Sequence, residues 1–391
     1  MTEKLYYQNP YQKRFGAHVL KCTGKDGRWQ VVLDRTAFYP EGGGQPSDTG
    51  VLDAANVLGA VEHGDEIVHF TDRPLPVSST VMGSINWPHR FGLMQQHTGE
   101  HIVSGIANRL FGVENVGFHM GEKFLTVDWS GRLTKNQIAL VECLTNEAVY
   151  RNLPVRAEYP TVEELAKMEY RSKKELTGAV RIVTVPGYDV CACCGTHVAF
   201  TGEIGAVKIL SAQNYKGGTR ITLACGAQAM NDYAEKQESV AQISSLLSAK
   251  PEEVGQAVER LLNESDSLKR QLSEIRGQLL QKKAESIPAD SGSACVFENG
   301  LPPEDLRKFA VLLAKRCGGT AVVFSGKDNA YRYALANAGQ DDVRPIGKAL
   351  NDAFSGRGGG SRELVQGTLK GTHSALKDLF AMLTKRMMKS Y

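Results

Sequence analysis

Two pairs of metal-binding residue types, far apart along the chain, constrain this sequence more than any other feature. His97 and His101 lie in the run GLMQQHTGEHIVSG, and Cys193 and His197 lie in CACCGTH. Residues four apart on a helix share one face, so each pair can present two ligands to one ion. Three imidazole nitrogens and one thiolate are a usual tetrahedral zinc set, and they favour zinc over magnesium or calcium. The fold therefore has to bring the two segments together.

Three alternatives stay open for this site. Cys191 or Cys194 could replace Cys193 as the thiolate, although the spacing favours Cys193, and the metal could be structural or catalytic. HTGEH also matches the H-x-x-E-H pattern of inverzincin proteases, in which the glutamate is the general base. Those enzymes complete their site with a carboxylate ligand, whereas this chain offers a Cys/His cluster. We therefore interpret Glu100 as a solvent-exposed helix residue.

Composition places the chain among ordinary globular proteins. Its 391 residues suffice for two to four domains, with 42% apolar residues and a net charge of +3. That charge is too small to indicate a nucleic-acid partner by itself, so any basic surface must be local. No run of apolar residues is long enough for a membrane span, and the first residues lack the apolar core of a signal peptide. We expect a cytosolic protein without a membrane partner, in which the isolated cysteines are small buried side chains.

Residues 1–88 are predicted to be rich in strands and to form a small β-barrel. Short runs of β-branched and aromatic residues, such as WQVVLD and EIVHFT, alternate there with turn sequences. Within them, Thr36–Gly50 reads TAFYPEGGGQPSDTG. Gly42, Gly43 and Gly44 allow a close approach of the backbone to a ligand, and the alternative is a flexible hairpin loop.

Residues 89–226 are predicted to form an α+β core with one mixed sheet and helices packed on it. Apolar periodicity indicates a helix over residues 89–110, and Thr134 with Gln137 and Thr161 with Glu164 are capping boxes that start two more. Strands are expected at residues 124–129 and in VRIVTV, AVKIL and TRITLAC.

Residues 227–287 are predicted to be helical. After Pro251, apolar positions alternate in steps of four and three, which is the heptad pattern of a coiled coil. The two helices could form an antiparallel hairpin, or the second could pair with another copy of the chain. The heptad positions are Val254, Val258, Leu261, Ser265, Leu268, Leu272, Ile275 and Leu279.

Residues 288–391 are predicted to form a compact α/β domain. A strand at CVFE, a helix over residues 303–317 and a strand at TAVVFSG indicate a βαβ unit, with further helices from Ile346 and His373. Between those helices lies SGRGGGSRELVQG. Its residues Arg357, Gly358, Gly359, Gly360 and Arg362 could hold a phosphate or an RNA backbone, and the alternative is a mobile surface loop.

Taken in order, these motifs resemble a known family. TAFYPEGGGQPSDTG, HTGEH and CCGTHVAFTGEIGAVKI are similar to the editing domain of alanyl-tRNA synthetases, and more so to the free-standing AlaX-type alanyl-tRNA editing proteins. KGGTRITLACG matches the end of that domain. SGRGGGSRELVQG resembles the DHH-associated RNA-binding domain that ends alanyl-tRNA synthetases. The resemblance covers nearly the whole chain and is to the long form of AlaX.

The resemblance implies a trans-editing hydrolase that deacylates tRNA(Ala) mischarged with serine or glycine. It implies Zn2+ held by His97, His101, Cys193 and His197, with the ion activating water or only positioning the substrate. Residues Gly42–Gln45 become candidates for contact with the terminal adenosine or the oxyanion. Thr98 becomes the candidate for contact with the serine hydroxyl.

A second hypothesis is a zinc-stabilised tRNA-binding module without catalysis. Under either hypothesis the domains are residues 1–88, 89–226, 227–287 and 288–391. A homodimer through the heptad helix or the C-terminal domain is also expected.

Overall fold

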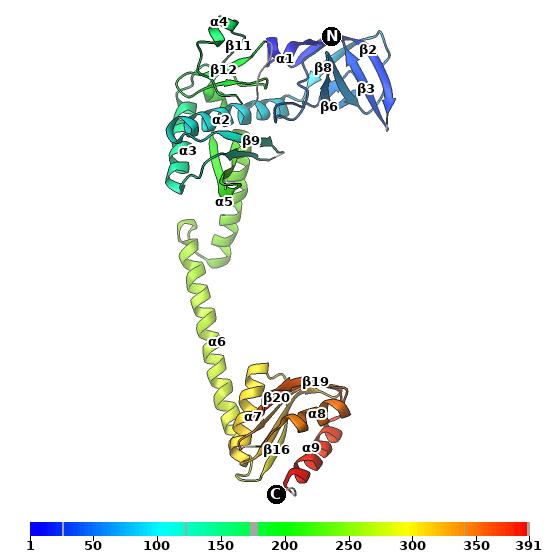
Figure 1. The fold of residues 1–391 in the computed structure, drawn as a ribbon, viewed down its shortest axis with the longest axis vertical. Coiled ribbons are helices and arrows are strands. Elements are labelled where there is room, and N and C mark those ends of the chain that lie inside the picture. Colours follow the sequence, from blue (N-terminus) through cyan, green and yellow to red (C-terminus); the bar gives the residue numbers. More distant parts are fainter. Residues whose placement is uncertain (26, 122, 173–178, 340, 389–391) are drawn as a thin grey trace. The chain divides into compact units, whose positions relative to one another are not determined.

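The structure is a computed structural model that describes residues 1–25, 27–121, 123–172, 179–339 and 341–388. The chain divides into two compact units, Met1–Ile243 and Ser244–Tyr391 (Figure 1). The mixture of several sheets with packed helices confirms the predicted combination of helices and strands. The finer division into four domains stays a prediction.

The first unit begins with a closed six-stranded barrel, whose strands are joined in the order β2-β3-β7-β6-β5-β8. Buried and exposed residues alternate along β6, as expected for a strand with one face on a core. The barrel interior contains Phe15, Leu33 and Ile67, each at most 4% exposed. The elements of this region are β1 (Glu3–Lys4), α1 (Leu5–Gln8), β2 (Arg14–Lys25), β3 (Arg28–Leu33), β4 (Arg35–Thr36), β5 (Gly50–Leu52), β6 (Ala55–His63), β7 (Glu66–Thr71) and β8 (Thr80–Ile85).

Helix α2 (Trp87–Phe111) is the central element of the first unit. Asn86 caps its start by accepting the His89 N–H, and Gly112 ends it in the left-handed conformation at φ 64°. Its middle, from Leu93 to Ala107, is buried without interruption, because other elements cover it on all sides. These include α3, β9, β13 and β15.

Two antiparallel sheets surround α2, so the predicted single mixed sheet is wrong. One has the order β14-β15-β10-β9 and the other β11-β12-β13. Short turns join β12 to β13 and β14 to β15, and such turns permit only antiparallel pairing. The remaining elements are β9 (Asn115–Met120), β10 (Leu125–Trp129), α3 (Lys135–Tyr150), β11 (Arg156–Glu158), α4 (Val162–Leu165), β12 (Ile182–Val185), β13 (Asp189–Ala192), the 3-10 helix η1 (Thr201–Ile204), β14 (Val207–Tyr215), β15 (Gly218–Cys225) and α5 (Ala227–Leu247).

Both predicted capping boxes are present. The side chains of Thr134 and Thr161 accept N–H groups at the starts of α3 and α4, and Gln137 and Glu164 return the contact to the caps. These local signals need no tertiary information, because both partners lie within one helical turn.

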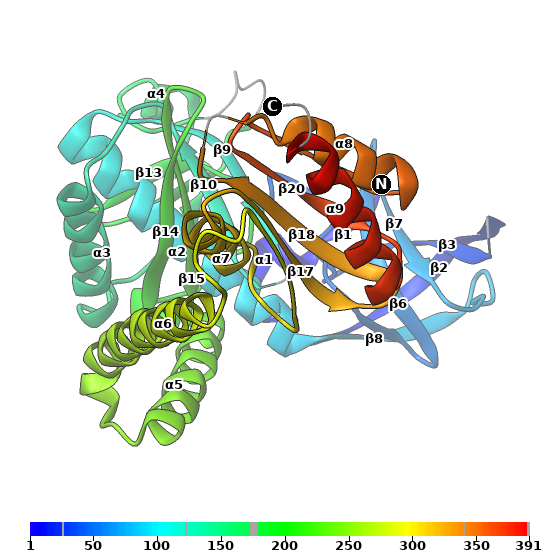
Figure 2. The ribbon, with the colours of Figure 1, turned by 90° about the horizontal axis from the view of Figure 1, so that it is seen from below.

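The second unit contains the five-stranded sheet β16-β17-β18-β20-β19. β16 and β17 are parallel and joined by α7, which confirms the predicted βαβ unit. α7 packs on one face of the sheet, whereas α8 and α9 lie together on the other (Figure 2). The elements are the 3-10 helix η2 (Pro251–Glu253), α6 (Val254–Glu285), β16 (Ser293–Glu298), α7 (Pro303–Cys317), β17 (Thr320–Lys327), β18 (Ala330–Asn337), α8 (Arg344–Ala353), β19 (Arg357–Gly360), β20 (Leu364–Leu369) and α9 (His373–Met388).

The heptad positions all fall within α6, which confirms the predicted helix but not its partner. Leu268 and Ile275 are 57% and 63% exposed in the single chain. The coiled coil and the homodimer stay predictions. None of the helices in the described ranges combines the length and apolar character that a membrane span requires.

A buried ion pair attaches the loop after β4 to the start of α2. Arg90 and Asp48 have no exposed surface, and the Arg90 Nε donates to Asp48 Oδ1 at 2.8 Å. The same guanidinium donates to the carbonyl oxygens of Pro10, at 2.9 Å, and Ala37, at 2.6 Å. One side chain therefore links three separate parts of the N-terminal region to α2.

Replacing Asp48 with alanine should lower the free energy of unfolding by about 3–5 kcal/mol, because Arg90 is left buried and unpaired. Urea unfolding measures this. The control is Glu66→Ala, which breaks the exposed pair with Lys21 and should change stability far less, because solvent screens such a pair. Equal losses of unfolding free energy in the two variants would show that the buried pair stabilises the fold no more than the exposed pair does.

Candidate metal centre

Four buried or partly buried side chains converge beside α2. His97 and His101 come from that helix, and Cys193 and His197 come from the segment after β13. Their ligand atoms all lie within 4.8 Å of one another. The structure thus brings together both pairs that the sequence singled out.

The distances within this cluster fit a tetrahedral ion. Cys193 Sγ lies 3.4 Å from Nε2 of His97 and 3.4 Å from Nε2 of His197. Metal–sulfur and metal–nitrogen bonds of zinc length place such donors about 3.5 Å apart. The cluster could therefore hold a metal ion at its centre.

The cysteine alternatives differ in position. Cys194 is exposed, and Cys191 is buried on the Asp189 side of His101, where these three form a second possible ligand group. Cys193 is the cysteine whose sulfur faces both His97 and His197. The geometry supports Cys193, and its assignment as the ligand stays a prediction.

Electrostatics favour the metal-binding forms of Cys193 and His197 in the cluster. Burial lowers the pKa of His101, but the charges of Cys193, Cys191 and Asp189 outweigh burial and hold that pKa well above its usual range. Burial raises the pKa of Cys193, but the neighbouring histidines, His97 and His101 above all, outweigh burial and hold the pKa well below its usual range. Burial also lowers the pKa of His197 to about 3, so its ring is neutral at pH 7. A thiolate and a neutral imidazole are the ligating forms of these residues.

Gln45 orients the ring of His97 through Nδ1, the ring nitrogen that does not face Cys193. Its Oε1 lies 2.9 Å from Nδ1 of His97 and accepts the N–H of Thr196 at 3.1 Å, while its Nε2 donates to Thr196 Oγ1. An amide oxygen can only accept, so Nδ1 of His97 carries the proton and Nε2 keeps its lone pair for the centre. Gln45 is fully buried.

Thr98 orients the ring of His197 in the same way. Its hydroxyl donates to the Met94 carbonyl at 2.8 Å, so Oγ1 is left to accept from Nδ1 of His197, 3.2 Å away. The Val198 N–H also donates to it. Gln45 and Thr98 were predicted to contact substrate. Those contacts stay predictions, and the observed positions are behind the ligand rings.

The glycine loop packs closely against β9, and its predicted approach to a ligand stays a prediction. Gly43 and Gly44 have φ of 61° and 84°, and a Cβ on Gly44 would lie 2.6 Å from the Phe118 ring. Phe118 in turn stacks on His97, with ring centroids 5.3 Å apart. Gly42 and Gln45 exchange two backbone hydrogen bonds, which close the loop and deliver Gln45 to the cluster.

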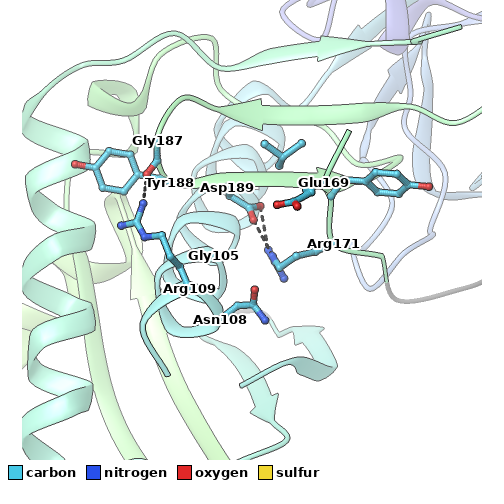
Figure 3. A pocket seen from close by; sticks show the side chains of 10 residues that line it. Gly105, Asn108, Arg109, Glu169, Arg171, Gly187, Tyr188 and Asp189 are labelled. Carbon is cyan, nitrogen blue, oxygen red and sulfur yellow. Dashed lines mark hydrogen bonds and ion pairs between the residues drawn. The ribbon is translucent and has the colours of Figure 1, made fainter. Parts of the chain in front are cut away.

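Asp189 and Arg171 complete the support of the cluster, and sequence reasoning missed both. Asp189 Oδ2 lies 3.0 Å from Nδ1 of His101, and Arg171 donates to both carboxylate oxygens, at 2.7 and 2.9 Å. A cavity of about 420 Å³ opens on the far side of this pair, where Arg109 and Tyr188 also line it (Figure 3). An available signal was the strand DVCA, where Asp189 and Cys191 share one face.

The expected solvent exposure of Glu100 is wrong. It is 1% exposed rather than solvated, accepts from Ser104 Oγ at 2.6 Å and also accepts from Asn115 Nδ2. Its expected exposure assumed that α2 has a solvent face, and the middle of α2 has none.

The predicted RNA contacts lie in the second unit. Arg357, Gly358, Gly359 and Gly360 form β19, an exposed edge strand paired only with β20 in the described sheet, and Arg362 follows it. The alternative of a mobile surface loop is therefore wrong, because these glycines make a regular antiparallel ladder. Their contact with RNA stays a prediction.

Cys193→Ser should lose bound zinc, whereas Cys194→Ser should retain about one ion per chain, since only the first sulfur faces the histidines. Metal analysis after exhaustive dialysis measures both. Full zinc retention by Cys193→Ser together with loss in Cys194→Ser would reverse the assignment.

Asp189→Asn should weaken zinc binding by about 10–100-fold, because the amide orients His101 less strongly than the carboxylate does. Competition with a chelator of known affinity measures the change. The control is Asp128→Asn, whose carboxylate pairs with Arg220 at 2.6 Å away from the cluster. An unchanged affinity in Asp189→Asn would exclude the supporting role.

Comparisons with known proteins identify relatives for both units. Residues 180–222 match the family described as the threonyl and alanyl tRNA synthetase second additional domain. Residues 11–88 match the class II (A) tRNA synthetases. The C-Ala domain from Aquifex aeolicus alanyl-tRNA synthetase matches at 17% identity with a TM-score of 0.22, over 24% of this chain and 87% of that chain, and no fold relationship follows from so low a score.

Relatives that align over nearly the whole of this chain show more than these partial matches. The alanine–tRNA ligase of Pyrobaculum neutrophilum is 34% identical over 96% of this chain, and that of Pyrococcus furiosus is 32% identical over 96%. This chain spans 44% and 42% of those two ligases. The alanyl-tRNA editing protein AlaX-L of Pyrococcus horikoshii is 28% identical over 97% of both chains. The predicted resemblance is thus confirmed: the chain is a relative of the long-form, AlaX-type alanyl-tRNA editing proteins and of part of the alanine–tRNA ligases.

Proposed function

We propose that this chain is a zinc-dependent aminoacyl-tRNA ester hydrolase that deacylates tRNA(Ala) mischarged with serine or glycine. The observation that carries this proposal is the buried cluster of His97, His101, Cys193 and His197, in a chain related over its length to an alanyl-tRNA editing protein. A separate hydrolytic reaction is needed for a physical reason. A synthetase pocket for alanine cannot reject similarly small amino acids strongly enough by binding alone, so a second, hydrolytic site is required.

The protein side chains fall into two roles in this proposal. The four cluster residues hold the ion, while Gln45, Thr98 and Asp189 fix the orientation of the three rings. When bound, zinc would polarise the ester carbonyl, lower the pKa of a water, or hold the aminoacyl end in place. Gly44 lies against Phe118, and the backbone N–H groups of Gly43 and Gly44 are proposed contacts for the oxyanion.

Binding of the tRNA body is assigned to the second unit. Glycines at an exposed sheet edge let a phosphate backbone approach closely, and Arg357 and Arg362 supply charge at the two ends of this strand. Phosphate contacts of this kind fix position and carry little sequence information, so affinity should fall as salt rises. A tRNA substrate would place the protein in the cytosol.

A structural metal is the second candidate. Four protein ligands fill a tetrahedral ion, as is usual in structural zinc sites. Under this hypothesis the chain would be a zinc-stabilised tRNA-binding module without catalysis. The two candidates give different results in the same assay.

Purified protein should speed the release of serine from seryl-tRNA(Ala) and leave alanyl-tRNA(Ala) intact. Cys193→Ser should lower kcat/KM by roughly 100-fold or more, since it removes a ligand of the ion. Circular dichroism checks that the variant is folded, and Cys194→Ser is the matched control. Tight tRNA binding without deacylation would favour the binding module, and normal deacylation by a zinc-free protein would reject the zinc-dependent hydrolase.

A further inference from the structure

The cavity of about 420 Å³ beside Asp189 has walls from three segments of the first unit. They are the C-terminal part of α2, the turn between β12 and β13 with the start of β13, and the segment after α4. We call it the Arg109–Glu169 cavity, after two charged residues that line it. The proposed deacylation gives this cavity no role, and none of the four cluster side chains lines it.

Contacts between the three segments fix the walls of this cavity. Gly105 lets the turn before β13 approach α2, because a Cβ at this position would lie 2.4 Å from the Tyr188 carbonyl oxygen. Arg109 donates a hydrogen bond to the Gly187 carbonyl in the same turn. The Arg171 backbone, after α4, makes two hydrogen bonds with the β13 segment, at 2.8 and 2.9 Å. The three walls are therefore held in place by contacts of the chain itself.

The charges that line the cavity are two of each sign, and one pair of them is internally neutralised (Figure 3). The Arg171 guanidinium donates to both carboxylate oxygens of Asp189, at 2.7 and 2.9 Å. Arg109 and Glu169 have no ion-pair partner among the residues that the structure describes. Arginine and exposed glutamate side chains are ionised at pH 7. The cavity therefore presents one uncompensated positive charge and one uncompensated negative charge.

The rest of the wall is neutral. Tyr188 contributes an aromatic ring, whose centre lies 5.8 Å from the Arg109 guanidinium, and Val190 contributes an apolar side chain. The Asn108 amide donates to the Val113 carbonyl at 3.3 Å. A volume of about 420 Å³ lies toward the small end of the range for ligand pockets. These features favour a small ligand that carries both charges and an uncharged side chain.

We propose that the Arg109–Glu169 cavity binds a free α-amino acid with a small, uncharged side chain. At pH 7 such a molecule carries one carboxylate and one ammonium group. Arg109 pairs with the carboxylate and Glu169 with the ammonium group, and hydrogen bonds between charged groups are the strong ones in proteins. A simple anion or a simple cation would satisfy only one of the two uncompensated charges.

This site is adjacent to the metal centre but separate from it. Asp189 forms part of the cavity wall, and its Oδ2 lies 3.0 Å from Nδ1 of His101. A free amino acid is a product of the proposed deacylation, and this cavity would hold it away from the cluster. The inference goes beyond the proposed function and does not depend on it, because the two pairing residues are not ligands of the ion.

Calorimetric titration of the zinc-loaded protein with alanine, propionate and ethylamine tests the match of charges. Propionate is alanine without its ammonium group, and ethylamine is alanine without its carboxylate. About one alanine should bind per chain, and each analogue should bind roughly tenfold or more weakly, because it loses the contact with one charged residue. Absence of alanine binding, or equal affinity for alanine and either analogue, would overturn the proposal.

Glu169→Gln keeps the shape of the side chain and removes its charge. It should weaken alanine binding roughly tenfold or more and leave propionate binding unchanged, because propionate has no ammonium group to pair with. The matched control is Glu163→Gln, at an exposed glutamate of α4 that does not line the cavity. Unchanged alanine binding by Glu169→Gln, or equal weakening in both variants, would contradict the assigned site.

Cys193→Ser distinguishes the cavity from the metal centre. Its alanine affinity should equal that of wild type, because Cys193 does not line the cavity. Loss of alanine binding in folded Cys193→Ser, together with normal binding by Glu169→Gln, would place the amino acid at the metal centre and reject the proposal. The titrations contain no tRNA. A protein that binds alanine but does not deacylate would therefore reject only the hydrolase, and the reverse result would reject only the amino-acid site.

Discussion

The metal centre depends on an interaction that contains none of its ligands. Arg90 and Asp48 pair in a site without exposed surface and join the loop after β4 to the first turn of α2. This contact holds the glycine loop against the helix, so Gln45 reaches His97, about two helical turns beyond Arg90. Because a buried charge without its partner is strongly unfavourable, the barrel and α2 are held in one relative position. The orientation of the His97 ring therefore depends on the ion pair between Arg90 and Asp48.

Sequence reasoning recovered the parts of the site that depend on spacing. The i, i+4 separation predicted that His97 and His101 share a helix face, and the two capping boxes predicted where α3 and α4 begin. Each of these relations involves residues within about one helical turn. Geometry of this kind requires no knowledge of which elements pack together.

The missed residues depend on tertiary packing. Asp189 supports His101 across two elements, and Glu100 is buried only because sheets and helices cover α2 on every side. Periodicity assumes that a helix has a solvent face, so it assigned Glu100 to water. For β19, the sequence left a backbone-binding segment and a mobile loop as alternatives, and pairing with β20, which is a tertiary contact, makes it a strand at the sheet edge.

The metal centre and the cavity of about 750 Å³ beside the first half of α2 differ in how many contacts hold their side chains. The cluster side chains and their supports are fixed by several contacts each, so most substitutions there disturb more than one ring. The outer rim of the cavity, at Ser47, His119 and Gln228, carries no ligand. Exchange of these three residues would leave the cluster side chains and their supports in place, so this wall can vary in sequence while the four-residue cluster stays the same.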